Sequence, residues 1–74
     1  MKFPARQRVI AAAIAQAREE AGLSKREASR RLGVPENWFQ RVESLERAIY
    51  LHELPAIAKV IGIDPEVLFR RCLR

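Results

Sequence analysis

An all-α fold of five short helices is the architecture that this sequence predicts. Strong helix formers fill most of the chain, and the three glycines, Gly22, Gly33 and Gly62, stand where a helical apolar pattern breaks off. Ser24 and Asp64 each follow such a break by two residues, and both side chains favour the start of a helix. No segment shows the alternation typical of a strand. The expected helices span about residues 4–21, 24–32, 35–43, 51–61 and 65–73 of one domain, residues 1–74.

The first expected helix carries one apolar stripe. Ile10, Ile14, Ala17 and Ala21 fall close to i, i+4 and i+7 spacing, so they share a face that can pack on a core. Gly22 follows at once and ends this helix.

A capping box predicts where the second helix begins. Ser24 is a good N-cap, and Glu27 follows three residues later, the spacing at which each side chain can reach the other residue's backbone N–H. Gly33 then breaks the helix. Its place suits a tight turn, because such turns often need a positive φ.

The third helix is expected to begin near Pro35, since proline is tolerated in the first turn. Phe39 and Val42 then lie on its inner face at i, i+3 spacing. Residues 44–50 have neither clear periodicity nor a strong cap, so they are predicted to connect this helix to the fourth.

Proline marks the start of the last two helices as well. Pro55 lies inside the apolar pattern of the fourth helix, so that helix must either kink or begin late, and Gly62 ends it. Asp64, Pro65 and Glu66 then have the residue types of an N-cap and the first two positions of a fifth helix.

Composition narrows the class of function. The 14 Lys and Arg against 9 Asp and Glu give a net charge of +5, which favours a polyanionic partner. Cys72 has no second cysteine to pair with, which suits a reducing cytoplasm, and residues 9–15 form an apolar run too short to span a membrane. His52 has no cysteine or second histidine for a metal site, and no catalytic motif is present. We therefore expect a cytoplasmic protein that is not an enzyme and has no cofactor.

The most informative feature is the break at Gly33 between two short helices. A turn of three or four residues containing glycine, with a second short helix close behind it, is typical of a helix-turn-helix. An ordinary αα-hairpin in a helical bundle has the same spacing, so spacing alone leaves both interpretations open.

The sequence resembles the lambda-repressor and Cro family of helix-turn-helix proteins from about residue 14 to residue 69. The joint spacing of several short segments carries this resemblance. These are Gly22-Leu23-Ser24-Lys25, Leu32-Gly33-Val34, Phe39-Gln40-Arg41-Val42-Glu43, Ala58-Lys59-Val60-Ile61-Gly62 and the run from Asp64 to Phe69. The resemblance implies a five-helix, lambda-repressor-like domain of the Cro/C1 type that binds double-stranded DNA.

The resemblance also implies an ion pair between two helices. The family commonly pairs an arginine late in its first helix with a glutamate at the end of its recognition helix, and Arg18 and Glu43 stand at those positions. Such a pair would tie the first helix to the third.

Several positions depart from the family pattern. Lys25 replaces a common glutamine, while Ala28 and Ser29 replace leucine and alanine, Ser29 being small enough for close helix packing. Leu45 stands at a common glycine position, so we expect the loop after the recognition helix to take another path. Trp38 lies beside Phe39, and because both cannot point straight into the core, core or dimer packing is favoured for Trp38 over a DNA contact.

The resemblance assigns DNA contacts residue by residue. The recognition helix, residues 35–43, enters the major groove with its N-terminal side chains on base edges. The expected base-reading residues are Glu36, Asn37, Gln40 and Arg41, and Glu36 is expected to lie beside Lys25. The expected phosphate contacts are Ser24, Lys25, Arg26 and Arg47, whereas Arg30 and Arg31 suit a solvated helix face as well.

These features predict a homodimeric regulator of transcription from a phage or bacterium. We expect it to repress its own or a neighbouring promoter, with no small-molecule ligand and no membrane partner. One alternative is an antitoxin-like interaction protein whose DNA binding serves autoregulation. A second is a helical interaction module that does not bind DNA.

Overall fold

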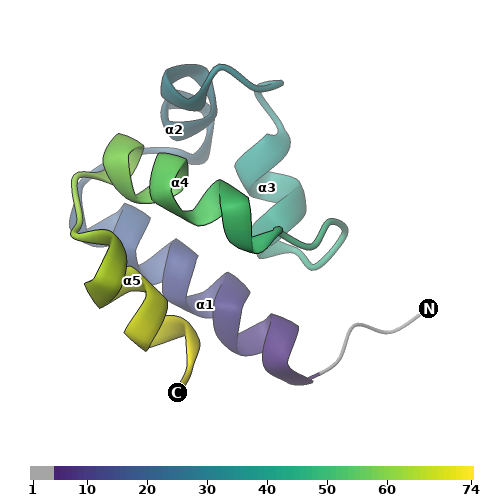
Figure 1. Ribbon diagram of the computed structural model, residues 1–74. Helices are drawn as coiled ribbons and strands as arrows, with labels where there is room; N and C mark the ends of the chain where they lie inside the picture. Colours follow the sequence, from purple (N-terminus) through teal and green to yellow (C-terminus); the bar gives the residue numbers. More distant parts are fainter. Residues whose placement is uncertain (1–4) are drawn as a thin grey trace.

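The computed structural model describes residues 5–74, and this part of the chain is entirely helical (Figure 1). A short 3-10 turn, η1, precedes the fourth helix, and no strand occurs among the described residues. The all-α prediction is therefore confirmed. The elements are α1 (Ala5–Glu20), α2 (Lys25–Leu32), α3 (Trp38–Glu43), η1 (Leu51–Glu53), α4 (Leu54–Ile61) and α5 (Pro65–Cys72).

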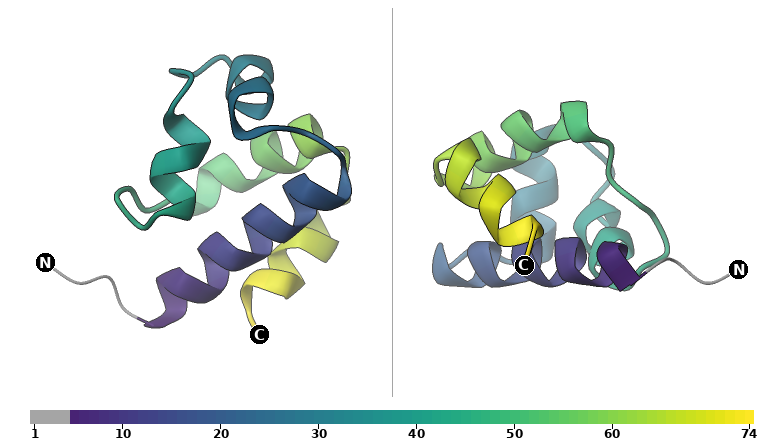
Figure 2. Two further views of the ribbon diagram at one scale, coloured as in Figure 1. Left: turned by 180° about the vertical axis from the view of Figure 1, so that it is seen from behind. Right: turned by 60° about the horizontal axis from the view of Figure 1, so that its bottom comes forward.

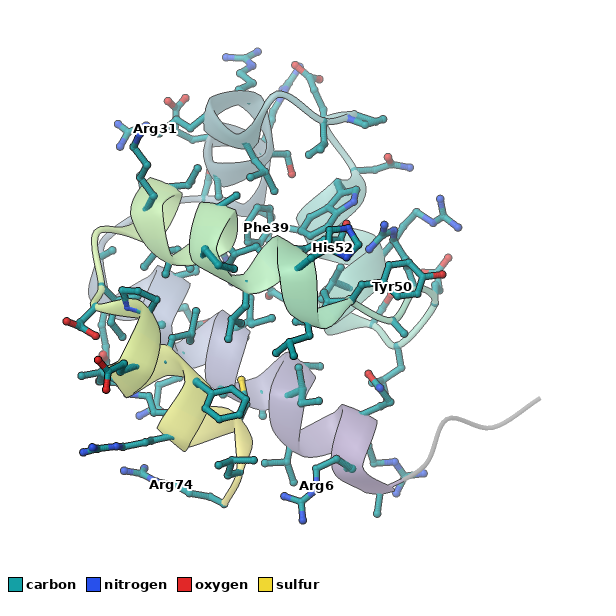
Figure 3. All side chains as sticks on the ribbon, in the orientation of Figure 1. Arg6, Arg31, Phe39, Tyr50, His52 and Arg74 are labelled. Atoms are coloured by element: carbon teal, nitrogen blue, oxygen red, sulfur yellow. The ribbon has the colours of Figure 1, made fainter. Side chains whose placement is uncertain are left out.

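The helices enclose one core. Helix α1 packs on α5 and α3, α2 packs on α3 and α4, and α4 also packs on α5 (Figure 2). Ile14, Phe39, Ile57 and Leu68 come from four different helices and are fully buried, with Phe39 near the centre (Figure 3). The small core thus holds α2 and α3 on a base formed by α1, α4 and α5.

Local caps fix the ends of α2 and α5 as the sequence predicts. The Ser24 hydroxyl accepts a hydrogen bond from the Glu27 backbone N–H at 3.0 Å, and the Asp64 carboxylate accepts one from Glu66 N–H at 2.8 Å. Only half of the capping box forms, because the Glu27 carboxylate bonds to Arg31 Nε at 3.1 Å instead.

Helix α3 begins three residues later than predicted. A helix beginning at Pro35 would pair its carbonyl with the N–H of Phe39. The Phe39 N–H instead donates to the Ser29 hydroxyl at 3.1 Å, and the Pro35 carbonyl accepts a bond from Trp38 N–H at 2.9 Å. Pro35, Glu36 and Asn37 therefore form a turn ahead of the helix.

Pro55 delays the fourth helix, one of the two outcomes predicted for it. Leu51–Glu53 forms the 3-10 turn, and α4 begins at Leu54, so Pro55 lies in its first turn, where a missing N–H breaks no helical bond. The Glu53 carboxylate accepts a bond from Tyr50 N–H at 2.8 Å and steadies this entry.

Leu45, which stands at a common glycine position of the family, has a glycine-like backbone conformation. Leu45 has a φ of 68°, the left-handed conformation that glycine adopts most readily. The backbone therefore keeps a glycine-like conformation here despite the larger side chain.

Candidate nucleic-acid interface

The turn between α2 and α3 depends on a left-handed glycine. Gly33 has a φ of 78° and caps α2, with its N–H donating to the Arg30 carbonyl at 3.1 Å. The next N–H, that of Val34, donates to the Ser29 carbonyl at 3.2 Å. These two bonds satisfy two of the last four carbonyls of α2 and turn the chain towards α3.

Ser29 couples the two helices from inside. Its side chain is fully buried, and its hydroxyl donates to the Lys25 carbonyl at 2.8 Å while accepting from Phe39 N–H at 3.1 Å. The hydroxyl thus caps α3 from the neighbouring helix. Sequence reasoning assigned Ser29 only a small size, and the available signal was a hydroxyl where the family commonly has alanine.

Arg18 and Glu43 fix the other end of α3. Arg18 Nε and Nη2 lie 2.7 and 2.9 Å from the two Glu43 carboxylate oxygens, and Arg18 Nη1 donates to the Leu23 carbonyl at 2.7 Å. The two side chains are only 7% and 8% exposed. The hydrogen bond to Glu43 raises the pKa of the Arg18 guanidinium, so Arg18 keeps its charge.

Trp38 and Phe39 are both buried, so the expectation that they could not both face inward is wrong. Their rings meet edge to face with centroids 5.1 Å apart, an arrangement that lets adjacent aromatic side chains share a core. The Arg47 guanidinium covers the Trp38 ring at 4.8 Å.

Arg47 is engaged within the protein. Its Nη1 and Nη2 atoms lie 3.1 and 3.0 Å from the Glu53 carboxylate oxygens, and Nη1 also donates to the Ala48 carbonyl at 2.8 Å. The Arg47 side chain is 27% exposed. The guanidinium therefore holds the loop before α4 through three contacts. A phosphate contact would need this group to face solvent. Tyr50 and His52 stack beside this loop (Figure 3).

The outer side of the α2–α3 unit presents the other predicted contacts. Asn37, Gln40 and Arg41 are exposed at the start and along the outer face of α3. Lys25 Nζ donates to Gln40 Oε1 at 2.7 Å, which joins the first turn of α2 to α3. Ser24 is exposed beside it.

Glu36 lies against two arginines of α2, and not against Lys25 as expected. Its carboxylate oxygens are 3.0 Å from Arg26 Nε and 2.9 Å from Arg30 Nε. The hydrogen bond from Arg30 holds the pKa of Glu36 below its ordinary value. Lys25 bonds to Gln40 instead.

Two kinds of feature are absent from residues 5–74. No cluster of three His, Cys, Asp or Glu side chains able to hold a metal occurs among them, and none of their helices is long and apolar enough to cross a membrane. Burial raises the pKa of the Cys72 thiol, which makes it a poor nucleophile at neutral pH.

A short helix, a left-handed glycine turn and a second short helix with exposed polar side chains define a helix-turn-helix domain of the DNA-binding class. Residues 9–70 match the sequence profile of the family described as "Helix-turn-helix domain". The chain belongs to this family. The family and the geometry of the α2–α3 unit together make it a helix-turn-helix protein of the DNA-binding class.

Solved structures share the whole fold. An XRE-family like protein from Pseudomonas syringae pv. tomato is 29% identical, with a TM-score of 0.83 over 93% of this chain and 84% of that chain. The restriction-modification controller protein C.Esp1396I superposes with a TM-score of 0.86 over 96% and 93% of the two chains. The clp gene regulator ClgR from C. glutamicum gives 0.83 over 96% and 92%. The last two are 15% identical to this chain, so they support the fold alone. No curated protein matched.

Proposed function

We propose that this protein is a sequence-specific repressor that occupies double-stranded operator DNA as a homodimer. The observation that carries the proposal is the outer side of the α2–α3 unit, where exposed Asn37, Gln40 and Arg41 follow a rigid turn. In helix-turn-helix complexes this part of the second helix enters the major groove. Repression follows from occupancy of a promoter.

One group of side chains suits contacts to bases, and a second group suits contacts to phosphates. Asn37 can pair with adenine and Arg41 with guanine, while Gln40 can read adenine or hold Lys25 in place. Ser24, Lys25 and Arg26 lie at the start of α2 and suit phosphate contacts. Arg47 leaves this set, because three donor contacts hold its guanidinium to Glu53 and Ala48 and its side chain is only 27% exposed.

The dimer surface that we propose is an apolar groove between α1, α5 and the residues just before α4. Leu51, Phe69 and Leu73 line it and are 73%, 42% and 56% exposed. Arg6 lies at one end, and Glu66 lines the adjoining hollow that shares Leu51 and Phe69. Because Arg6 and Glu66 carry opposite charges, we propose that a two-fold axis through the groove pairs Arg6 of one chain with Glu66 of the other.

Selection from random duplexes tests the DNA-binding proposal. We expect a pseudo-palindromic preference with half-sites about 34–36 Å apart. Binding that shows no sequence preference would reject specific recognition, and the absence of binding to any duplex would reject DNA binding itself. A reporter driven by the selected site then measures repression.

A charge swap tests the dimer separately. Arg6→Glu should weaken self-association in sedimentation experiments, and adding Glu66→Arg should restore it. A wild-type chain that stays monomeric on its selected operator would contradict the dimer and leave the DNA contacts standing.

A further inference from the structure

Glu36 bridges two arginines at the edge of the candidate interface. Arg26 and Arg30 lie one turn apart on α2, and the Glu36 carboxylate, which comes from the turn before α3, gives one oxygen to each. All three side chains are well exposed, with fractions of 68%, 55% and 50% for Arg26, Arg30 and Glu36. We call these three residues the Glu36 cluster.

The fold has little need of this cluster. Exposed ion pairs contribute little to stability, and the α2–α3 turn is already held by Gly33 and by the buried hydroxyl of Ser29. The three charges instead lie next to Asn37, on the outer surface assigned to DNA.

The chemistry of the cluster opposes contact with a phosphate backbone. A guanidinium is a good phosphate ligand, yet the Nε of each arginine is already bonded to a carboxylate, whose charge lies beside any phosphate that the remaining N–H groups would bind. To bind a phosphate through Nε, either arginine must leave Glu36, and the carboxylate freed in this way would repel the same backbone. The hydrogen bond that lowers the pKa of Glu36 keeps this charge in place at neutral pH.

We propose that Glu36 is a specificity-determining residue that acts through Arg26 and Arg30, by competing with DNA phosphates for their guanidinium groups. This inference rests on the proposed DNA binding. Binding to random duplex depends almost entirely on cations, so it loses most from the competition. Operator binding is held in one register by the base contacts of α3, whereas random binding settles wherever the most cations reach phosphates, so operator binding depends less on Arg26 and Arg30. Glu36 therefore raises the ratio of specific to random affinity without reading a base.

The test compares Glu36→Gln with Glu27→Gln as a matched control. Both changes remove one carboxylate paired with an α2 arginine. Glu27 pairs with Arg31, whose side chain extends over α4, away from α3 (Figure 3). Affinity is measured on random and selected duplexes at several salt concentrations, and thermal melts establish that both variants fold.

We expect Glu36→Gln to bind random duplex at least about threefold more tightly than Glu27→Gln at low salt. Its salt slope should steepen by about one to two units per subunit, since up to two arginines become available to phosphate. The gain on the selected duplex should be smaller, and the selected sequence should not change.

Two results would overturn the inference while wild type still binds DNA. One is equal random-duplex affinity for the two variants. The other is a changed preference at one base pair in Glu36→Gln without a general gain in affinity, which would make Glu36 a base reader. If wild type binds no duplex at all, the proposed function fails, and the inference fails with it.

A second experiment tests the competition between Arg30 and Glu36 without relying on the size of the Glu36→Gln effect. Arg30→Gln should lower random-duplex affinity less in the wild-type background than in Glu36→Gln, because Glu36 already occupies Arg30 in wild type. Equal losses in the two backgrounds would show that Arg30 and Glu36 do not compete, and would reject the proposal.

Discussion

The two ends of α3 carry the same kind of ion pairing in opposite surroundings. At its C-terminal end Glu43 meets Arg18 with contacts of 2.7 and 2.9 Å, and both side chains are less than 10% exposed. Before its N-terminal end Glu36 meets Arg26 and Arg30 at 3.0 and 2.9 Å, with side chains at least 50% exposed. The distances are nearly equal, so distance does not separate the two roles. Access to water does, because a buried charge must keep its partner whereas an exposed one can exchange it.

The largest expected effect is on the buried pair. Arg18→Ala or Glu43→Ala should each lower the free energy of unfolding by about 3 kcal/mol, because the remaining charge is left in the protein without its partner. Chemical denaturation measures this loss. The double variant should lose clearly less than the sum of the two single losses.

The exposed Glu27–Arg31 pair provides the control for that experiment. Its contact of 3.1 Å resembles that of the buried pair, but its side chains are 43% and 54% exposed. Arg31→Ala should therefore cost less than about 1 kcal/mol. Comparable losses at Arg18 and Arg31 would remove the distinction between the two ends of α3.

Features set by neighbouring residues could be predicted from the sequence. Ser24 and Asp64 cap helices, and Gly33 and Gly62 end them with positive φ, because each depends on backbone groups only a few residues away. The long-range pair between Arg18 and Glu43 came instead from the family resemblance, which supplied spatial information that spacing alone lacks.

Features that depend on a choice between partners could not be predicted. Helix α3 begins late because the hydroxyl of Ser29, ten residues earlier, takes the N–H of Phe39. Helix α2 carries four basic residues that Glu36 could meet. Only the folded arrangement gives Lys25 to Gln40 and Arg31 to Glu27, and leaves Arg26 and Arg30 to Glu36. The contact between Arg47 and Glu53 could not be predicted for the same reason, since Glu53 reaches Arg47 from η1.

The second effect in size concerns Arg41, which lies between the two ends of α3 on its outer face. Arg41→Ala should weaken operator binding by about 1–3 kcal/mol and relax preference mainly at one position of each half-site. Selection from random duplexes measures both. If affinity falls and the selected sequence stays the same, Arg41 contacts the backbone and not a base.

Ser29 tests whether burial also decides the effect of losing a hydrogen bond. Ser29→Ala removes the only hydroxyl that reaches Phe39 N–H, so a buried donor loses its partner, and the free energy of unfolding should fall by about 1–2 kcal/mol. Ser44→Ala is the control. Its hydroxyl is exposed and bonds to Glu46 and the Arg41 carbonyl, where water can replace it, so its loss should be within about 0.5 kcal/mol.

The smallest expected effect is at Lys25, which we assign to a phosphate. Unlike Arg26 and Arg30, Lys25 is bonded to a neutral group, Gln40, so it can approach a phosphate without releasing a carboxylate. Lys25→Ala should therefore weaken selected and random duplexes by similar factors and lower the salt slope by about one unit per subunit. Arg26→Ala should change the slope less, because Glu36 already competes for that guanidinium. If Lys25→Ala and Arg26→Ala change the salt slope equally, the basic residues of α2 act only as a diffuse positive field. The partner of each cation within the protein then has no effect on DNA binding.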